Sequence, residues 1–173
     1  MNDRGDDVEL TARTARFRET FDAFYVREYH QMVALAAAVS GSRTAAEDLA
    51  QEAMVRALRH WDRIAEYDRP GTWARRVTIN LASSHVRRLR VEARSLLRLG
   101  RPRPIPPPSP EHTGVWEELR RLPARQRAAL ALFYLEDRPV EEIAEIMECA
   151  PATARVHLHR GRQALAAALG GDA

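Results

Sequence analysis

The sequence predicts an all-helical protein made of two small domains that a proline-rich linker joins. Apolar residues recur at helical spacing on both sides of the linker, without the alternation of β-branched residues that is typical of strands. Six of the ten prolines lie between Pro102 and Pro110, and this density excludes a helix and favours an extended path. The expected organisation is a frayed polar tail, a first helical domain, the linker and a second helical domain, at residues 1–16, 17–97, 98–112 and 113–169.

The first domain is expected to begin with two helices. An apolar stripe over 17–39 forms the first helix, and Ser40-Gly41-Ser42 ends it. The spacing of Thr44 and Glu47 is that of a capping box, which places the start of a second helix there and its end near His60. The residues expected to lie inward on the second helix are Leu49, Ala53, Ala57, Leu58 and Trp61.

Prolines mark the starts of the remaining helices. A loop is expected over 62–69, and Pro70 suits the first turn of a third helix that runs to about Arg90. In the second domain a short amphipathic stretch over 115–122 comes first. Three further helices then begin at or next to a proline, at Pro123, Pro139 and Pro151.

The last two helices are joined by the tight turn Glu148-Cys149-Ala150, which predicts a helix-turn-helix arrangement. Either Val156 or Leu158 is expected to complete the packing of this pair. The charges are sorted, because the first helix is acidic and the second is basic up to Asp172. This sorting favours insertion of the second helix into the major groove of DNA. The alternative is a plain helical hairpin with a solvated basic face.

A second basic stretch, from His85 to Arg103, contains seven arginines and one acid, Glu92. Polar residues precede it on the same helix, and an aromatic residue beside such groups can hold unstacked bases. The alternative, which we favour from the residues alone, is that Trp73 belongs to the core. All 27 basic residues are arginine, which suits phosphate and guanine edges but is also what a GC-rich coding sequence supplies.

Several other classes of function are disfavoured by the sequence. The single cysteine, Cys149, excludes an internal disulfide and a multi-cysteine metal site. His157 and His159 diverge on a helix and cannot share a metal ion. There is no pattern of a catalytic triad or of a glycine-rich phosphate loop, so we expect no enzyme, no cofactor and no metal. No apolar run approaches a membrane span, and the first ten residues do not resemble a signal peptide, so we expect a cytoplasmic protein.

Two long segments resemble the extracytoplasmic-function (ECF) sigma factors of the sigma-70 family. AEDLAQEAMVRALRHW at 46–61, followed by TWARRVTINLASSHVRRLR at 72–90, is similar to sigma region 2. LPARQRAALALFYLEDRPVEEIAEIMECAPATARVHLHRGRQAL at 122–165 is similar to sigma region 4. The resemblance implies an alternative sigma factor that binds RNA polymerase core, recognises the −35 and −10 promoter elements and promotes strand opening. It also implies an anti-sigma factor as a further partner.

The resemblance implies binding roles for residues to which composition alone assigns none. Through Asp48, Gln51 and Glu52, the acidic helix face would bind the clamp coiled coil of the polymerase β′ subunit. The β subunit would be a further partner. The loop from Ile64 to Gly71 would hold a flipped base of the non-template strand. The −10 DNA would be lined by Trp73, Arg76, Asn80, Ser83, Ser84 and Arg87. The −35 element would meet Arg155, His159 and Arg160 at base edges, with Thr153, Val156, His157 and Arg162 around them.

Three positions depart from the usual pattern of region 4. Ala154 stands where valine is usual, and His157 where a permanent positive charge is common. Val156 replaces a small polar residue, which favours contact with a thymine methyl group over a hydrogen bond. These differences affect the −35 sequence and not the class of function.

Two other functions remain as alternatives. A stand-alone helix-turn-helix regulator would explain residues 113–169 but would leave the acidic face of the second helix without a role. A helical adaptor that binds only protein would give salt-insensitive binding and no effect on transcription.

Overall fold

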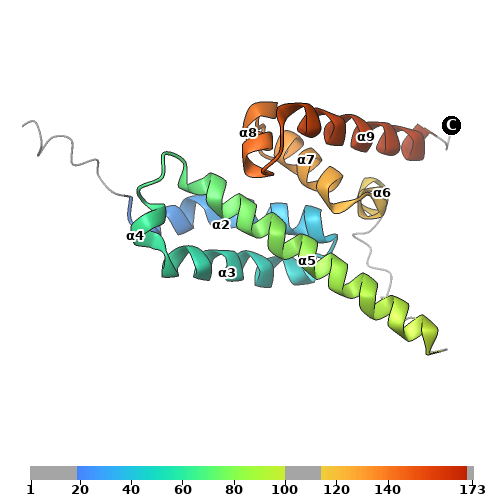
Figure 1. Ribbon diagram of the computed structural model, residues 1–173, viewed down its shortest axis with the longest axis horizontal. Helices are drawn as coiled ribbons and strands as arrows, with labels where there is room; N and C mark the ends of the chain where they lie inside the picture. The colour runs from blue at the N-terminus through green and yellow to red at the C-terminus, as the bar shows by residue number, and fades with distance from the viewer. Residues whose placement is uncertain (1–18, 100–113, 171–173) are drawn as a thin grey trace, which may run out of the picture.

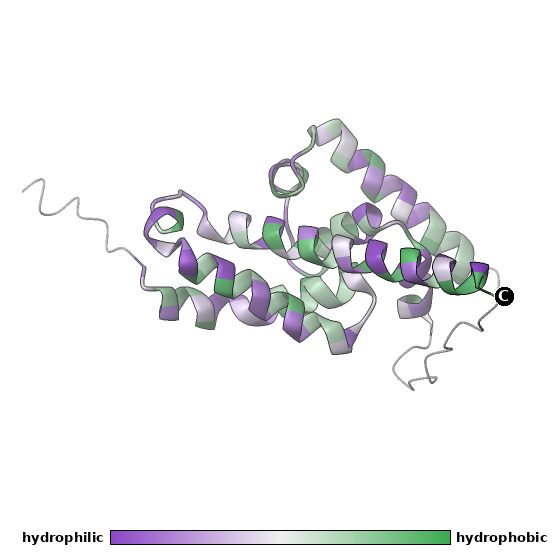
Figure 2. Ribbon diagram, turned by 60° about the horizontal axis from the view of Figure 1, so that its bottom comes forward, coloured by the Kyte–Doolittle hydropathy of each residue, from purple (hydrophilic) through white to green (hydrophobic). Residues whose placement is uncertain are grey.

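The computed structural model describes residues 19–99 and 114–170, and over these residues it contains helices and turns but no strand (Figure 1). The all-α prediction is therefore confirmed. Phe17, the expected tail and nearly all of the expected linker lie outside the described residues. Along each long helix hydrophilic and hydrophobic residues alternate around the circumference (Figure 2), which is the pattern of helices that bury one face.

The N-terminal helices, α2 to α5, form the first packed unit. Helix α2 spans Phe21–Ser40, and the hydroxyl of Thr20 caps its start by accepting a hydrogen bond from the Ala23 amide. Its end is closed by Gly41 at a φ of +70°, a conformation that favours glycine, with the Gly41 N–H donating to the Ala37 carbonyl. Helix α3, Arg43–Arg59, packs antiparallel beside it.

Two details of α3 differ from the expectation. Its N-cap is Ser42, whose hydroxyl accepts a 3.2 Å hydrogen bond from the Ala45 amide, so the capping box at Thr44 is wrong. Ser42 has the extended backbone that an N-cap needs, whereas Thr44 already lies inside the helix. Leu58 is 54% exposed, so the expectation that it lies inward is wrong. Met54, next to Ala53 on the buried side of the helix, packs inward instead.

A short helix interrupts the loop expected over 62–69. Helix α4, Trp61–Ile64, forms because Trp61 packs into the core, with its ring centre 4.7 Å from that of Phe24. The indole N–H of Trp61 also donates to the Glu19 carbonyl at 3.2 Å. Ile64 is fully buried in α4, so the loop proper is 65–69 and the interpretation of Ile64 as loop is corrected.

Helix α5 spans Pro70–Arg98 and is eight residues longer than expected. Residues 91–98 contain leucine, arginine, alanine and glutamate, which favour helix, and no proline or glycine interrupts them. Pro70 occupies the first helical position, as expected. The last turns of α5 project beyond the rest of the fold (Figure 1).

The C-terminal helices, α6 to α9, form the second unit, with bounds Val115–Arg121, Ala124–Tyr134, Val140–Ile146 and Pro151–Leu169. The expected prolines lie at or just before the starts of the last three. Between α8 and α9 the turn passes through Glu148 at a φ of +50°. Leu158, 3% exposed, completes the packing of this pair, whereas Val156 is 44% exposed.

The two units share one continuous hydrophobic core. Leu35 and Val39 of α2 and Ile79 of α5 belong to the same buried cluster as Leu130 of α7 and Ile143 of α8. Helix α7 packs against α2, and α8 packs against α5. A second cluster, around Phe24, Met32 and Met54, lies within the N-terminal helices alone. The sequence did not predict this contact between the units.

Candidate nucleic-acid and protein interfaces

Helix α9 presents its outer face because its inner face is fixed to α7 and α8. Ala154, Leu158 and Gly161 are the buried positions of this helix. A β-carbon at Gly161 would lie 2.8 Å from Cδ1 of Leu130, so glycine permits the close crossing of α9 and α7. The opposite side of α9 is exposed at Thr153, Arg155, Val156, His159 and Arg160. The structure therefore brings the predicted −35 residues together on one helix, and most of them face away from the core.

The two flanks of α9 are held differently. On one flank, Arg155 pairs with Glu141 at 2.8 Å. On the same flank, the Arg162 guanidinium lies 4.6 Å from the ring centre of Phe133. On the other flank, His157 faces a cleft against α5, and burial, followed by the charges of Arg125 and Arg160, lowers its pKa.

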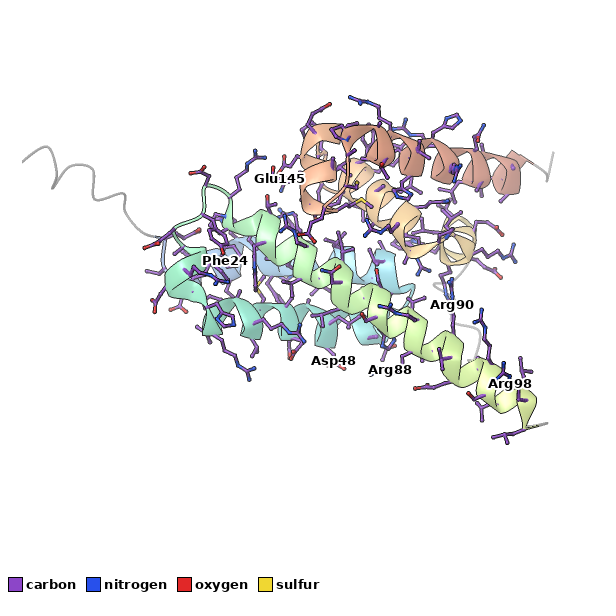
Figure 3. All side chains as sticks on the ribbon, viewed as in Figure 1. Phe24, Asp48, Arg88, Arg90, Arg98 and Glu145 are labelled. Atoms are coloured by element: carbon purple, nitrogen blue, oxygen red, sulfur yellow. The ribbon has the colours of Figure 1, made fainter. Side chains whose placement is uncertain are left out.

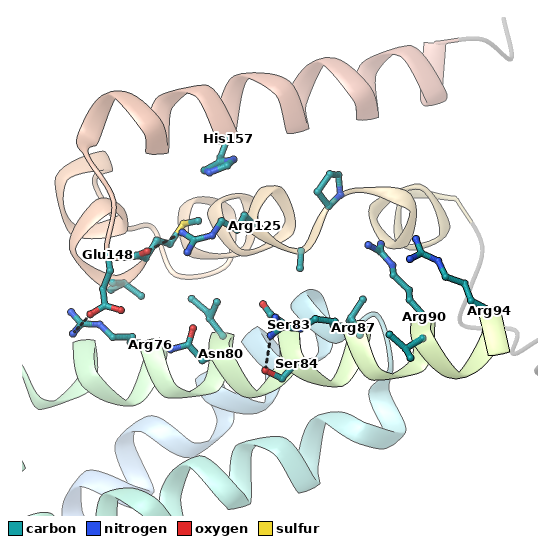
Figure 4. Close-up of a pocket in the computed structure, with 17 residues that line it drawn as sticks. Arg76, Asn80, Ser83, Ser84, Arg87, Arg90, Arg94, Arg125, Glu148 and His157 are labelled. Atoms are coloured by element: carbon teal, nitrogen blue, oxygen red, sulfur yellow. Dashed lines mark hydrogen bonds and ion pairs between the residues drawn. The ribbon is translucent and has the colours of Figure 1, made fainter.

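That cleft has a volume of about 850 Å³ and separates α5 from α7, α8 and α9 (Figure 4). Its α5 wall holds five of the six residues predicted for the −10 element, which we call the −10 candidate set: Arg76, Asn80, Ser83, Ser84 and Arg87. Further along α5, Arg90 and Arg94 line the same cleft and point toward the C-terminal helices (Figure 4). The facing wall contributes Arg125, Met147 and His157. A cleft so rich in cations attracts anions.

Trp73 lies apart from this set. It is half-buried and packs against the cluster around Phe24 and Met32, and it does not line the cleft. The packing agrees with the core interpretation that the residues alone favoured. Its predicted contact with −10 DNA stays a prediction.

Within the −10 candidate set, Arg76 and Arg87 already have partners. Nη1 of Arg76 lies 3.0 Å from the Glu148 carboxylate, and Nη2 donates to the Glu145 carbonyl at 3.0 Å. Nη2 of Arg87 donates to the Ser84 hydroxyl at 3.2 Å. Glu148 is a residue of the C-terminal helices, so one predicted DNA contact is occupied by the chain itself.

The residue that sequence reasoning missed is Arg75. Its side chain is 2% exposed and is held between Glu28 of α2 and Glu136, which follows α7. Glu28 lies at i, i+4 and i+7 spacing with Met32 and Leu35, on the apolar stripe of its helix. Arg75 lies likewise with Ile79 and Ala82. Opposite charges on two apolar stripes were the signal that could have predicted a buried pair.

A second buried arginine, Arg127, has fewer partners. Its Nη1 donates to the Arg120 carbonyl at 3.0 Å, while Nε and Nη2 have no hydrogen-bond partner among the described residues. Burial lowers the pKa of Arg127 to about 10, and the neighbouring charges of Arg90 and Arg120 add to the effect. Arg127 remains charged at neutral pH, and it adds to the positive potential between the two units.

The predicted polymerase-binding residues lie on the opposite side of the molecule from the cleft. Asp48, Gln51 and Glu52 are exposed on α3, and the Asp48 and Glu145 labels lie on opposite sides of α5 in Figure 3. Glu52 pairs with Arg56 one turn along at 2.8 Å, an exposed contact of little energy. The three side chains therefore form one accessible, mainly acidic face.

In the described part of the chain no group of His, Cys, Asp and Glu side chains is arranged to hold a metal ion. None of the described helices is both long and apolar enough to cross a membrane.

Comparison with known protein families assigns both units. Residues 24–91 match sigma-70 region 2, and residues 113–165 match sigma-70 region 4. Among solved structures, the sigma factor RpoE of Bartonella quintana, in complex with the anti-sigma factor NepR, shares the fold. The TM-score is 0.68 at 22% identity, over 88% of this chain and 98% of that one.

Curated sigma factors are similar to this chain over most of its length. The ECF sigma-E factor of Escherichia coli K12 is 29% identical over 184 residues, covering 95% of each chain. The ECF sigma factor SigM of Mycobacterium tuberculosis H37Rv is 27% identical, over 98% of this chain and 87% of its own length. The probable sigma factor RfaY of Xanthomonas campestris pv. campestris is 30% identical over 89% of this chain, which spans only 41% of that protein. The chain belongs to the sigma-70 family, and within it to the ECF RNA polymerase sigma factors.

Proposed function

We propose that this sigma factor uses three separate surfaces, one for polymerase core and one for each promoter element. The observation that carries the proposal is the exposed basic face of α9 in the same chain as the −10 candidate set on α5. A single DNA-binding domain needs only one of these surfaces. Two of them, on units joined by a linker, suit two promoter elements that lie apart on DNA.

The −35 element is proposed to bind α9. A recognition helix in the major groove presents its outer residues to base edges. Arg160 and His159 are exposed there and can donate hydrogen bonds, and Val156 offers an apolar contact for a thymine methyl group. Arg155 is proposed to meet base edges with them, and Thr153, His157 and Arg162 are proposed as phosphate or rim contacts.

The −10 element is proposed to bind α5, and loop 65–69 is proposed to receive a flipped base. Asn80 is an exposed amide on a basic helix, so it can both donate to and accept from a base edge. Arg76 and Arg87 supply charge for the phosphates, and Ser83 and Ser84 supply hydroxyls. Capture of unstacked bases lowers the free energy of the melted state, which promotes strand opening without any covalent chemistry.

Polymerase core is proposed to bind the face formed by Asp48, Gln51 and Glu52. These side chains lie within about one helical turn, so they can meet a single basic surface, for which we propose the clamp coiled coil of β′. The C-terminal helices would meet the β subunit. This assignment places the protein in the cytoplasm with the polymerase.

An anti-sigma factor is proposed as a further partner. The Bartonella sigma factor that shares this fold was solved with such a protein bound. No enzymatic step is assigned to the chain.

Run-off transcription with purified core polymerase on a pool of genomic promoter fragments tests the proposal. We expect transcripts from a defined subset of fragments only when the chain is added. Tight promoter binding by the chain alone, without stimulated transcription, would favour the stand-alone regulator. Salt-insensitive protein binding with no transcript would favour the adaptor.

A further inference from the structure

We propose that the cleft between α5 and the C-terminal helices binds a small oligophosphate, the anion that nucleotides and short inorganic polyphosphates have in common. The residues that would hold it, which we call the cleft arginines, are Arg90 and Arg94 of α5 and Arg125 of α7. None of the three belongs to the −10 candidate set, and none is proposed here for the −35 element or for polymerase core. Binding at this site would need neither DNA nor polymerase, so it goes beyond the proposed function.

The cleft arginines lie on both walls of the cleft. Arg90 and Arg94 are four residues apart on α5, so their side chains leave the same face of the helix about one turn apart. Both point toward the C-terminal helices (Figure 4). Arg125 lines the facing wall, where its Nη1 donates to the Met147 carbonyl at 3.0 Å. All three side chains are exposed, so an anion in solution can reach them.

These three cations have no acidic partner within the part of the chain that the structure describes. Elsewhere arginines are paired: Arg88, on the other side of α5, contacts Glu92, and Arg76 contacts Glu148. Glu148 is the one acid among the described residues that line the cleft. Like charges four residues apart on a helix repel each other. A bound anion would therefore neutralise a charge that the described chain leaves uncompensated.

A buried arginine next to the cleft strengthens this positive charge. Arg127 is 2% exposed, and its Nε and Nη2 have no hydrogen-bond partner among the described residues. Burial lowers its pKa to about 10, and the charges of Arg90 and Arg120 add to the effect, so both of these residues lie near it. Arg127 stays protonated at neutral pH, and salt screens a buried charge less than an exposed one. An anion at Arg90 would thus be attracted by a second, poorly solvated cation.

The class of ligand follows from charge, shape and size. A guanidinium group binds phosphate oxygens through two parallel hydrogen bonds, and linked phosphate groups can meet several arginines at once. The cleft volume of about 850 Å³ lies in the range of sites for small molecules. Val86, Val91 and Pro123 line the same cleft and offer apolar contacts to a nucleoside. These features together favour an oligophosphate over an anion with a single carboxylate.

Isothermal titration calorimetry of the full chain with sodium tripolyphosphate, at fixed ionic strength and without divalent cations, tests the site. We expect saturable binding of one anion per chain. Arg90→Gln combined with Arg94→Gln should weaken binding by about tenfold or more, because each substitution removes charge-assisted hydrogen bonds. Arg88→Gln combined with Arg98→Gln removes the same charge from the same helix outside the cleft, so it should leave the affinity nearly unchanged.

Titration with ATP in place of tripolyphosphate distinguishes the two sources of the phosphate groups. If a nucleoside contacts the apolar part of the cleft, ATP should bind more tightly than tripolyphosphate. Val91→Ser should then abolish this difference without changing the affinity for tripolyphosphate. Equal affinities in the unchanged chain would assign the site to the phosphate groups alone. Each of these two results supports an oligophosphate site.

Thermal unfolding provides a second measurement. An anion that binds only the folded chain should raise the melting temperature as its concentration increases. Without the anion, the Arg90→Gln, Arg94→Gln variant should melt at a higher temperature than the Arg88→Gln, Arg98→Gln variant, because it loses the repulsion with Arg127. Arginine and glutamine have similar helix propensities, so far-ultraviolet circular dichroism should show the same helix content in both. An equal or lower melting temperature would contradict the repulsion.

Absence of saturable binding of both tripolyphosphate and ATP would overturn the inference, and so would equal affinities of the two double variants. A short single-stranded oligodeoxynucleotide tests the other class of ligand. If it binds through Arg90 and Arg94 and neither small anion binds, these arginines are DNA contacts only and the inference is wrong. Run-off transcription separates this failure from failure of the proposed function. A chain that directs core polymerase to promoters but binds no oligophosphate contradicts only this site.

Discussion

Nε of Arg162 donates a 2.9 Å hydrogen bond to the hydroxyl of Tyr134, which fastens the middle of α9 to the end of α7. The same guanidinium lies over the rings of Phe133 and Tyr134, a cation–π arrangement. Arg160, two residues earlier, is exposed and makes no such contact with the part of the chain that the structure describes. The two arginines thus differ in their freedom to meet a base, and they lie on different sides of the helix because they are two residues apart.

Arg160→Ala and Arg162→Ala should therefore have different effects on promoter binding. If Arg160 is bidentate to a guanine, its loss should cost ~1–3 kcal/mol and relax the preference at one base pair. Loss of Arg162, as a phosphate contact, should weaken all sequences alike and reduce the salt slope by about one unit. A base-by-base −35 selection with holoenzyme at fixed salt checks both. If the selected motif changes with Arg162→Ala but not with Arg160→Ala, Arg162 contacts the bases and the assignment of Arg160 to them is wrong.

The acidic face of α3 allows a direct test by charge reversal. Asp48→Arg combined with Glu52→Arg should weaken core binding by at least about tenfold, because like charges would meet across the interface. Helix content should not change, since both side chains are exposed. Glu92→Arg with Glu117→Arg makes the same change of charge at exposed positions elsewhere and should leave affinity unchanged. Equal affinities of the two double variants in a titration against core would contradict the assignment of this face.

Asn80 is expected to act in strand opening more than in initial binding. Asn80→Ala removes an amide that can pair with an unstacked base, and it leaves the charges of α5 in place. The closed promoter complex should form almost as before, while melting detected by permanganate should fall. Ser95→Ala, on the exposed end of the same helix, is the control. Equal loss of both steps would instead indicate a defect in folding.

The pH dependence of His157 follows from its place in the cleft. Burial lowers its pKa first of all, with Arg125 and Arg160 adding repulsion, while Glu148 is the acid on the same cleft. Between the lowered value and about 6.5, the unfolded chain binds more protons at this site than the folded chain. The free energy of unfolding should therefore rise with pH across this window, less so in His157→Gln. Titration of His157 by NMR should give a pKa below 6.5, and a value above it would contradict the geometry of the cleft.

The sequence predicted those features of the fold that depend on nearby residues. The prolines at 70, 123, 139 and 151 mark helix starts because their preferences are local, and the helix-turn-helix follows from a short turn between two apolar patterns. Serine and threonine can both cap a helix, so residue type does not decide between Ser42 and Thr44. The cap is Ser42 because of where the chain leaves Gly41, which the sequence pattern does not specify.

The contact between the two units could not be predicted in the same way. Arg75 and Glu136 are 61 residues apart, and the linker that separates their helices carries no signal of how they meet. In the sequence, Glu136-Asp137-Arg138 indicates only a break between two helices. The candidate −35 and polymerase-binding residues came from local patterns and the family resemblance, and their roles stay predictions until the variants are measured.

The proposed role as a sigma factor is measured by run-off transcription with core polymerase on the genomic promoter pool, in which the chain is compared with its Asp48→Arg, Glu52→Arg variant. We expect new transcripts with the unchanged chain, from promoters that share a −35 and a −10 motif at a fixed spacing. We also expect the charge-reversed variant, at the same concentration, to lose most of these transcripts. Absence of transcripts with the unchanged chain, when core is active with another sigma factor, would contradict the proposed function. Equal output from the variant would contradict the role of the acidic face of α3 in core binding.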